Sequence, residues 1–312
     1  MKPTKVLFLI SIIQLVLPLF LSAQIPFRVM SYNVENLFDT NDNPEKDDND
    51  FLPEGNHYWN KKRYYLKLRQ TAKVILAAGE WETPALIGIC EIENDTVASD
   101  LITHTPLRNM NYQFCITDGP DRRGINVALL FQPDKFRKIN QQSIPIRFTR
   151  KQHKITRDIL YVSGLLVSGD TLDVFVCHFP SRYGGEKESE QDRIDAASTL
   201  RELSDSLSNI RQHPQLIAMG DFNDTPSDPS ISQHLTKGCL YNLFATLKDS
   251  HIKGTHKYQD RWSLLDQMFT NLTANSSTGS LRLIEGSPRI FAPSFLLKDD
   301  KTWIGKRPFR TY

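Results

Sequence analysis

The chain has 312 residues, of which 39% are hydrophobic and 24% charged, and its formal net charge is +2. This composition fits a globular protein with a substantial core. The near balance of 38 basic and 36 acidic residues excludes the overall basic excess of many nucleic-acid-binding domains, but it leaves a local basic face possible.

Residues 1–23 have the pattern of a secretory signal peptide. Lys2 and Lys5 precede an apolar run over 6–21, and Ala23 provides a small residue at its end. We expect cleavage after Ala23, export to the periplasm or the extracellular space, and no stable membrane insertion afterwards. An uncleaved N-terminal membrane anchor is the alternative, because the run is nearly long enough to span a bilayer.

The rest of the chain, 25–312, alternates between strand and helix patterns and predicts one domain. The predicted helices are Trp59–Ala78 and Glu186–Ile210, which have apolar residues at helical spacing. The predicted strands are Phe27–Asn33, Ala85–Cys90, Asn111–Ile116, Ile125–Phe131, Ile159–Val167, Leu172–Cys177, Leu216–Met219 and Trp262–Thr270. Strands of both alternating and continuously apolar type favour two packed sheets with helices outside.

The four cysteines do not predict a disulfide framework. Cys90 and Cys177 each end an apolar strand pattern, directly before a candidate site residue, and their spacing matches no metal motif. We therefore expect buried free thiols.

Polar residues recur at the ends of the predicted strands. A polar group beside a buried run is costly unless it is paired or bound to something. A single example is usually a turn or cap residue, whereas repetition favours a shared site. The recurring residues are Asn33, Glu35, Glu91, His178, Asp221, Asn223 and Asp266.

The residue types indicate metal-assisted phosphoester chemistry. Carboxylates without cysteine ligands suit a hard cation, Mg²⁺ or Mn²⁺, which can neutralise phosphate charge. Asparagine and histidine can contact phosphate oxygens and orient a water molecule. The sequence lacks a serine nucleophile elbow and the HExxH zinc motif, which argues against serine hydrolases and zinc proteases.

The order of these segments resembles that of the endonuclease/exonuclease/phosphatase superfamily, over about Phe27–Tyr312. The segments that carry the resemblance are Ser31–Glu35, Cys90–Asn94, His178–Arg182, Gly220–Asp224 and Leu265–Gln267, of which Gly-Asp-Phe-Asn-Asp is the strongest match. The segments 178–185 and 306–312 are similar to an exported bacterial subgroup. The resemblance implies an α/β DNase I-like fold, a four-layer sandwich of two packed mixed β-sheets with helices outside.

The same resemblance implies roles on the metal side of the site. Glu91 matches the principal metal ligand, and we prefer it to Glu93 because it directly follows the apolar strand. Glu35 is expected near the metal. Asn33 is expected to contact the phosphate or its water network.

Four further residues are expected to act on the phosphate and the attacking water. By resemblance, His178 contacts the phosphate and Asp221 activates the water. Asn223 stabilises the transition state, and Asp266 supports a catalytic histidine.

The family pattern ends in a Ser-Asp-His segment on a final strand, and this sequence departs from it. Asp249–His251 is similar but precedes Asp266. We expect that the 25–312 domain is truncated and that the natural reading frame continues past Tyr312. Otherwise, His251 and His256 are the first substitutes to test.

We predict a monomeric, exported nuclease, an endonuclease, with a nucleic-acid phosphodiester as substrate. Arg122, Arg123 and Arg182 could hold additional phosphates and Lys61–Arg63 could line a groove, although solvated surface positions are equally expected. The alternatives are a phosphatase or phosphodiesterase acting on inositol phosphates or phospholipid headgroups, and a non-catalytic binding protein with the same fold.

Overall fold

The computed structural model describes residues 26–150, 154–245, 247, 254–275 and 279–310. The signal peptide predicted at 1–23 and the triplet Asp249–His251 lie outside these residues. Within the described ranges, no helix has both the length and the apolar composition that a membrane crossing requires.

Two large β-sheets form the centre of the molecule. The first has the order β1 (Val29–Leu37), β2 (Leu86–Ile92), β4 (Asn126–Phe131) and β3 (Gln113–Ile116). The second has the order β5 (Phe136–Ile144), β6 (Ile159–Leu166), β7 (Thr171–His178), β8 (Leu216–Asp221), β12 (Asp266–Thr270) and β9 (Tyr241–Asn242). The pairs β1–β2 and β7–β8 are parallel and the others are antiparallel, so both sheets are mixed.

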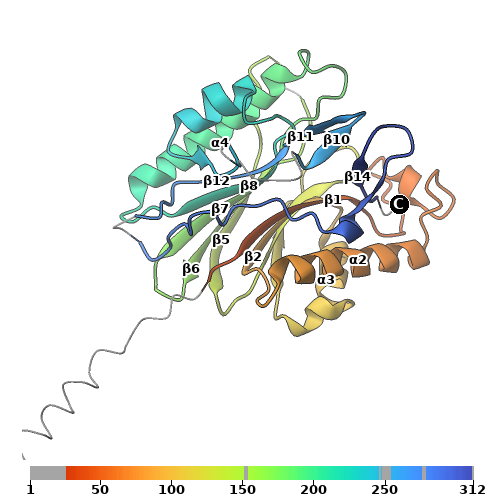
Figure 1. Ribbon diagram of the computed structural model, residues 1–312, viewed down its shortest axis with the longest axis horizontal. Coiled ribbons are helices and arrows are strands. Elements are labelled where there is room, and N and C mark those ends of the chain that lie inside the picture. The colour runs from red at the N-terminus through yellow and green to blue at the C-terminus, as the bar shows by residue number, and fades with distance from the viewer. Residues whose placement is uncertain (1–25, 151–153, 246, 248–253, 276–278, 311–312) are drawn as a thin grey trace, which may run out of the picture.

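Helices cover the outer faces of both sheets (Figure 1). On one side lie α2 (Lys61–Gly79) and α3 (Asp95–Thr103), and on the other lies α4 (Glu190–Ile210). Leu68, Ala72 and Ile75 of α2 are fully buried against the first sheet, at the spacing of one helix face. The predicted four-layer sandwich is confirmed.

The apolar core between the two sheets sets their separation. Leu129 from the first sheet packs in one cluster with Val162, Val176 and Met219 from the second. A Cβ atom added to Gly88 would lie 2.8 Å from the side chain of Met219. A side chain at this position would therefore push the sheets apart.

The remaining elements are short. Two small hairpins pair β10 (His256–Tyr258) with β11 (Arg261–Ser263) and β13 (Leu297–Asp299) with β14 (Lys306–Pro308). The other short turns are η1 (Asn49–Phe51), η2 (Pro106–Asn109), the π-helical η3 (Ser230–His234), η4 (Leu235–Lys237) and η5 (Ser294–Leu296).

The strand predicted at Trp262–Thr270 is wrong as a single element. Its first part is β11, which belongs to a separate hairpin, and its second part is β12. The backbone N–H groups of Leu265 and Asp266 both donate to the hydroxyl of Thr255, at 3.2 and 3.0 Å. This side-chain contact takes the place of ladder bonding at the break.

The chemistry of the cysteines agrees with the prediction. All four are free thiols, and Cys90, Cys115 and Cys177 are buried. The Cys90 thiol donates to the carbonyl of Cys177 at 3.2 Å, which links the two sheets directly behind the candidate site.

Candidate active site

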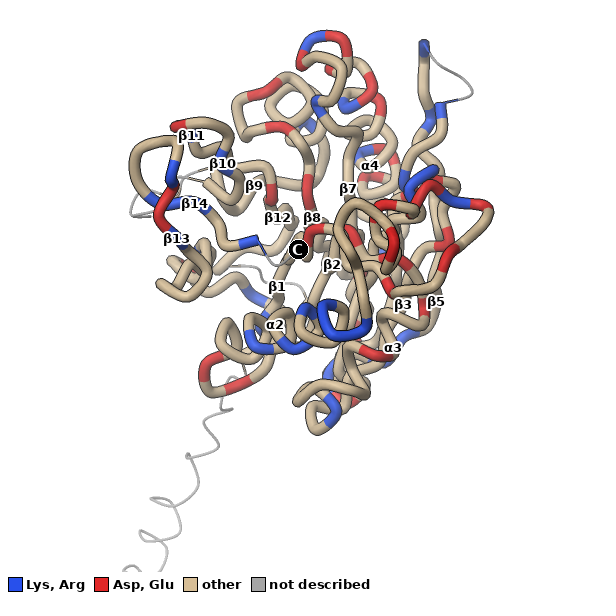
Figure 2. Tube along the Cα trace, turned by 90° about the vertical axis from the view of Figure 1, so that its right-hand side faces the viewer, with Lys and Arg blue, Asp and Glu red and all other residues tan. Residues whose placement is uncertain are grey.

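Strand register brings the predicted site residues to one edge of the two sheets. Asn33 lies opposite Cys90 in the parallel pair β1–β2, next to Glu91. Asp221 lies opposite His178 in the parallel pair β7–β8 and opposite Asp266 in the antiparallel pair β8–β12. The acidic ends of β8 and β12 are therefore neighbours (Figure 2).

The backbone is strained where the site is built. Register shifts interrupt β1 and β2 near their ends. Glu35, Asn36, Glu91 and Asn223 have φ values of 55°, 59°, 65° and 51°, in the left-handed region that costs non-glycine residues energy. Bulges of this kind re-aim side chains, and here they accompany the turn of Glu91 toward Asn33.

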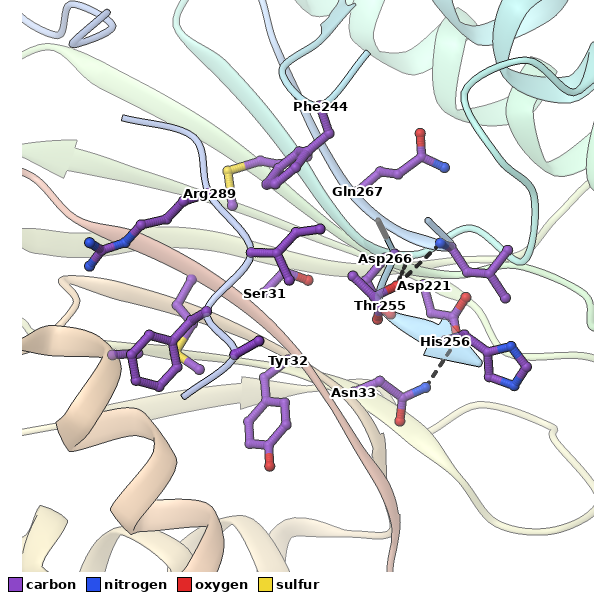
Figure 3. Close-up of a pocket in the computed structure, with 18 of the residues that line it drawn as sticks. Ser31, Tyr32, Asn33, Asp221, Phe244, Thr255, His256, Asp266, Gln267 and Arg289 are labelled. Carbon is purple, nitrogen blue, oxygen red and sulfur yellow. Dashed lines mark hydrogen bonds between the residues drawn. The ribbon is translucent and has the colours of Figure 1, made fainter. Parts of the chain in front are cut away.

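One amide joins the two sheets across the site. The Asn33 Nδ2 donates to Asp221 Oδ2 at 3.0 Å and to Glu91 Oε1 at 3.2 Å, and its Oδ1 accepts from the Glu35 N–H at 2.8 Å. The Asn36 N–H donates to the second oxygen of Glu91 at 2.9 Å. In Figure 3, Asn33, Asp221, Asp266 and Thr255 lie around one end of the cavity.

His178 completes this cluster as a neutral imidazole. Its Nε2 lies 3.8 Å from Glu91 Oε1 and 4.0 Å from Asp221 Oδ2. Burial, and then the charges of Arg157 and Arg123, lower its pKa well below the ordinary value. Its Nδ1 has no hydrogen-bond partner within the described part of the chain.

Burial raises the pKa of both aspartates in the cluster. The pKa of Asp221 is also raised by the charge of Glu91, and that of Asp266 by the charge of Asp221. The Asn223 N–H donates to Asp221 Oδ1 at 2.9 Å. Among the described residues, Asp266 Oδ1 has no hydrogen-bond partner. Burial therefore disfavours the charged form of both carboxyl groups, and a bound cation would stabilise that form.

Two predicted site residues have their side chains engaged elsewhere. The Asn223 Nδ2 donates to the Phe179 carbonyl at 3.0 Å. The Glu35 carboxylate pairs with Arg310 at 3.0 Å, and its carbonyl accepts from the buried Lys67 ammonium. These contacts do not support the metal role expected of Glu35, whose backbone instead shapes the Asn33 loop.

Arg182 is likewise fully occupied as a structural residue. Its guanidinium pairs with Glu186, Asp224 and Asp228 at 2.9, 3.0 and 2.6 Å. A role in holding phosphate is therefore not supported. The cluster Lys61–Arg63 forms the first turn of α2 and does not line the cavity.

Sequence reasoning named His256 of β10 (His256–Tyr258) only as a substitute to test, and it missed the preceding Thr255. The Thr255 hydroxyl accepts a hydrogen bond from the backbone N–H of Asp266. His256, the next residue, lines the same cavity (Figure 3). Burial, and then Arg310 and Arg182, lower the pKa of His256. The sequence signal for Thr255 was its proximity to the Leu265–Gln267 match.

The donor set fits a hard divalent cation. The cluster lies in a cavity of about 2740 Å³. Among the described residues, no group of three or more His, Cys, Asp and Glu side chains is arranged to hold a metal ion by itself. Mg²⁺ typically uses one or two carboxylates and completes its shell with water and substrate phosphate. Glu91, beside the uncompensated Asp221 and Asp266, provides this open arrangement.

Glu93 faces away from this cluster, as the preference for Glu91 requires. Its carboxylate accepts from the Asp39 N–H at 2.6 Å, in the acidic loop after β1. Burial, and then the charges of Asp39 and Asp48, raise its pKa to about 8.

We expect the Glu93→Gln variant to lose part of the pH dependence of stability. Because the folded-state pKa is raised, the native protein keeps a proton that the unfolded chain releases, so stability falls as pH rises from about 5 to 8. Glutamine stays neutral and removes this slope. Urea denaturation of both proteins at pH 5 to 8 measures the effect, and parallel profiles would contradict the assignment.

The family relationship follows from comparison with known proteins. The model of the Endonuclease/Exonuclease/phosphatase family matches residues 28–312, and the chain belongs to this family. Members of the family hydrolyse phosphoester bonds, and the superfamily generally depends on divalent metals. No curated protein sequence gives a significant match.

Solved structures agree on the fold. A mannosyl-6-phosphatase from Bacteroides thetaiotaomicron superposes with a TM-score of 0.56 at 18% identity, over 78% of this chain and 84% of that chain. A family protein from the same organism gives 0.54 at 16%, over 78% and 80%. A humanized D. rerio TDP2 gives 0.50 at 15%, over 80% and 85%.

Proposed function

We propose that the chain is a divalent-metal-dependent phosphodiester hydrolase and, within that class, an exported endonuclease. The observation that carries the proposal is the convergence of Glu91, Asp221, Asp266 and His178 at one end of a large cavity. The signal-peptide pattern supports export. The cavity volume of about 2740 Å³ exceeds the roughly 300–1,000 Å³ of small-molecule sites, which supports a polymeric substrate.

We assign a separate role in hydrolysis to each residue of the cluster. Glu91 would hold the cation, which when bound neutralises phosphate charge and stabilises the leaving oxygen. Asp221 accepts the proton of the attacking water, and the Asn33 amide fixes its Oδ2 for that purpose. His178, neutral and buried, donates a hydrogen bond to a phosphate oxygen. When ionised, the Asp266 carboxylate would add a negative charge beside Asp221.

A second candidate is a phosphatase or phosphodiesterase acting on small phosphorylated molecules, inositol phosphates and phospholipid headgroups included. The fold likeness to the mannosyl-6-phosphatase favours keeping this candidate. The two activities require the same cation and differ in the size of the group beyond the phosphate.

We expect Mg²⁺ or Mn²⁺ to restore phosphodiester hydrolysis to protein stripped with EDTA. Among the described residues, no Lys or Arg side chain lies within 4.0 Å of the carboxylates of Glu91, Asp221 and Asp266, so a divalent cation can bind there. The assay compares plasmid DNA, bis(4-nitrophenyl) phosphate, mannose 6-phosphate and an inositol phosphate. Cleavage of DNA in preference to the monoesters supports the nuclease. Metal-independent turnover contradicts the proposal, and metal binding without any turnover identifies a binding protein.

A further inference from the structure

A rigid loop over 118–124 joins β3 to β4 beside the cluster. The half-buried side chain of Lys46 packs against Gly124, and its ammonium donates to the carbonyls of Gly119 and Asp121 at 3.0 and 3.2 Å. The Gly119 N–H donates to the Asn126 side chain at 2.9 Å. The loop is thereby fixed to the sheet and to the acidic loop after β1.

A buried ion pair ties the same loop to the end of β7. Arg157 pairs with Asp121 at 3.3 Å, and both side chains are more than nine-tenths buried. The second nitrogen of the guanidinium donates to the carbonyl of Phe179, the residue after His178, at 2.8 Å. Arg157 therefore fixes the position of the loop relative to the end of β7, where His178 lies.

This loop presents Arg123 to the cavity. The Arg123 N–H donates to the Asp121 carboxylate at 3.0 Å, and its side chain is exposed and lines the same cavity as His178 and Asp221. Within the described residues, it forms no ion pair of 4.0 Å or less. Arg122, its neighbour, is exposed but does not line the cavity.

The other two arginines beside His178 have their charges satisfied. Arg157 is committed to Asp121 and the Phe179 carbonyl, and Arg182 is committed to three carboxylates. Of these three arginines, Arg123 is therefore the one that can bind a ligand without breaking an ion pair. A guanidinium held by a fixed loop matches the oxygens of a phosphate group.

We propose that Arg123 binds a second phosphate of the substrate, next to the phosphate that is hydrolysed at Glu91 and Asp221. The inference rests on the proposed function for the position of the hydrolysed phosphate. The substrates are then molecules with at least two phosphates, either an oligonucleotide or a polyphosphorylated small molecule. Selectivity against single-phosphate substrates then arises from this arginine.

The test compares wild type with Arg123→Gln, Arg123→Lys and the matched control Arg122→Gln. Binding of a fluorescent single-stranded oligonucleotide and of an inositol bisphosphate is measured in EDTA, which prevents metal-dependent turnover. Arg123→Gln should weaken binding of at least one of them by about 10- to 100-fold, the scale of a hydrogen bond to a charged group. Arg123→Lys should recover part of the loss, and Arg122→Gln should stay within about twofold of wild type.

Turnover with Mg²⁺ then supplies an independent readout. The loss in kcat/KM for Arg123→Gln should lie mainly in KM, and it should be at least tenfold larger for the better two-phosphate substrate than for bis(4-nitrophenyl) phosphate. Equal losses on all substrates, or binding as tight as that of Arg122→Gln, would overturn the inference. If wild type shows no turnover but binding depends on Arg123, the proposed function fails and the inference stands. If Arg123→Gln weakens binding of the oligonucleotide, the substrate is a nucleic acid. If it weakens binding of the inositol bisphosphate instead, the substrate is a small polyphosphorylated molecule.

Discussion

Replacing Asp221 with asparagine is expected to lower kcat for phosphodiester hydrolysis by about 10²–10⁴-fold while the protein stays folded. The substitution removes the carboxylate that we propose as the acceptor of the proton from the attacking water. An amide oxygen can still accept the hydrogen bond from the Asn223 N–H. Because burial and Glu91 raise the pKa of Asp221, a neutral group at this position avoids a charge that the fold disfavours.

The matched control is Asp134→Asn, which changes an exposed aspartate outside the cavity lining in the same way. Circular dichroism and thermal melting establish that both variants fold, and kcat is then measured at saturating Mg²⁺. If Asp221→Asn and Asp134→Asn turned over at the same rate, Asp221 would not be the base. Because the substitution also removes the negative charge, that charge would not be required for turnover either.

The convergence of the site could be predicted from sequence because strand ends obey simple geometry. His178 and Asp221 are the last residues of the buried strands β7 and β8, and Glu91 is the penultimate residue of β2. Parallel strands finish at one edge of a sheet. The layer order could be predicted for the same reason, since apolar faces of strands and helices must cover one another. These features depend on local patterns that a single sequence contains.

Elements without such a pattern were missed. Seven consecutive residues of β5 are exposed, so its sequence lacks the alternation of a half-buried strand. The helix α3 is only nine residues long, and it begins where the Asn94 side chain accepts from the Val97 N–H. Edge position and a local cap define these elements.

The ion pairs of individual charged residues could not be predicted, because their partners are distant in the sequence. Arg182 meets Asp224 and Asp228, which lie 42 and 46 residues further along the chain. Glu35 meets Arg310 from near the other end of the domain. A candidate list drawn from residue type alone therefore includes charges that the fold uses to hold itself together.

The Gly-Asp-Phe-Asn-Asp segment contains both kinds of carboxylate. Its first aspartate, Asp221, lies in the candidate active-site cluster with Asn33 and His178, whereas its last, Asp224, is a structural residue. The Arg193 Nε lies 2.7 Å from Asp224 Oδ1, close enough for an ion pair although not aligned as a hydrogen bond. The side chains of the pair are 1% and 2% exposed, and Ser230 donates to the other oxygen of Asp224 at 2.6 Å.

Asp224→Ala is therefore expected to lower the free energy of unfolding by roughly 3–5 kcal/mol, the cost of leaving a buried charge without its partner. Among its described partners, Arg193 would keep the hydrogen bonds to Ser189 and the Glu186 carbonyl, and Arg182 would lose one of its three carboxylate partners. Because this cost comes from the stranded charge, the double variant Arg193→Met with Asp224→Leu should recover much of the loss. Urea denaturation of Arg193→Met, Asp224→Leu and the double variant measures the coupling. Strictly additive losses would show that the two side chains act independently, and that packing rather than charge pairing anchors the segment carrying Asp221.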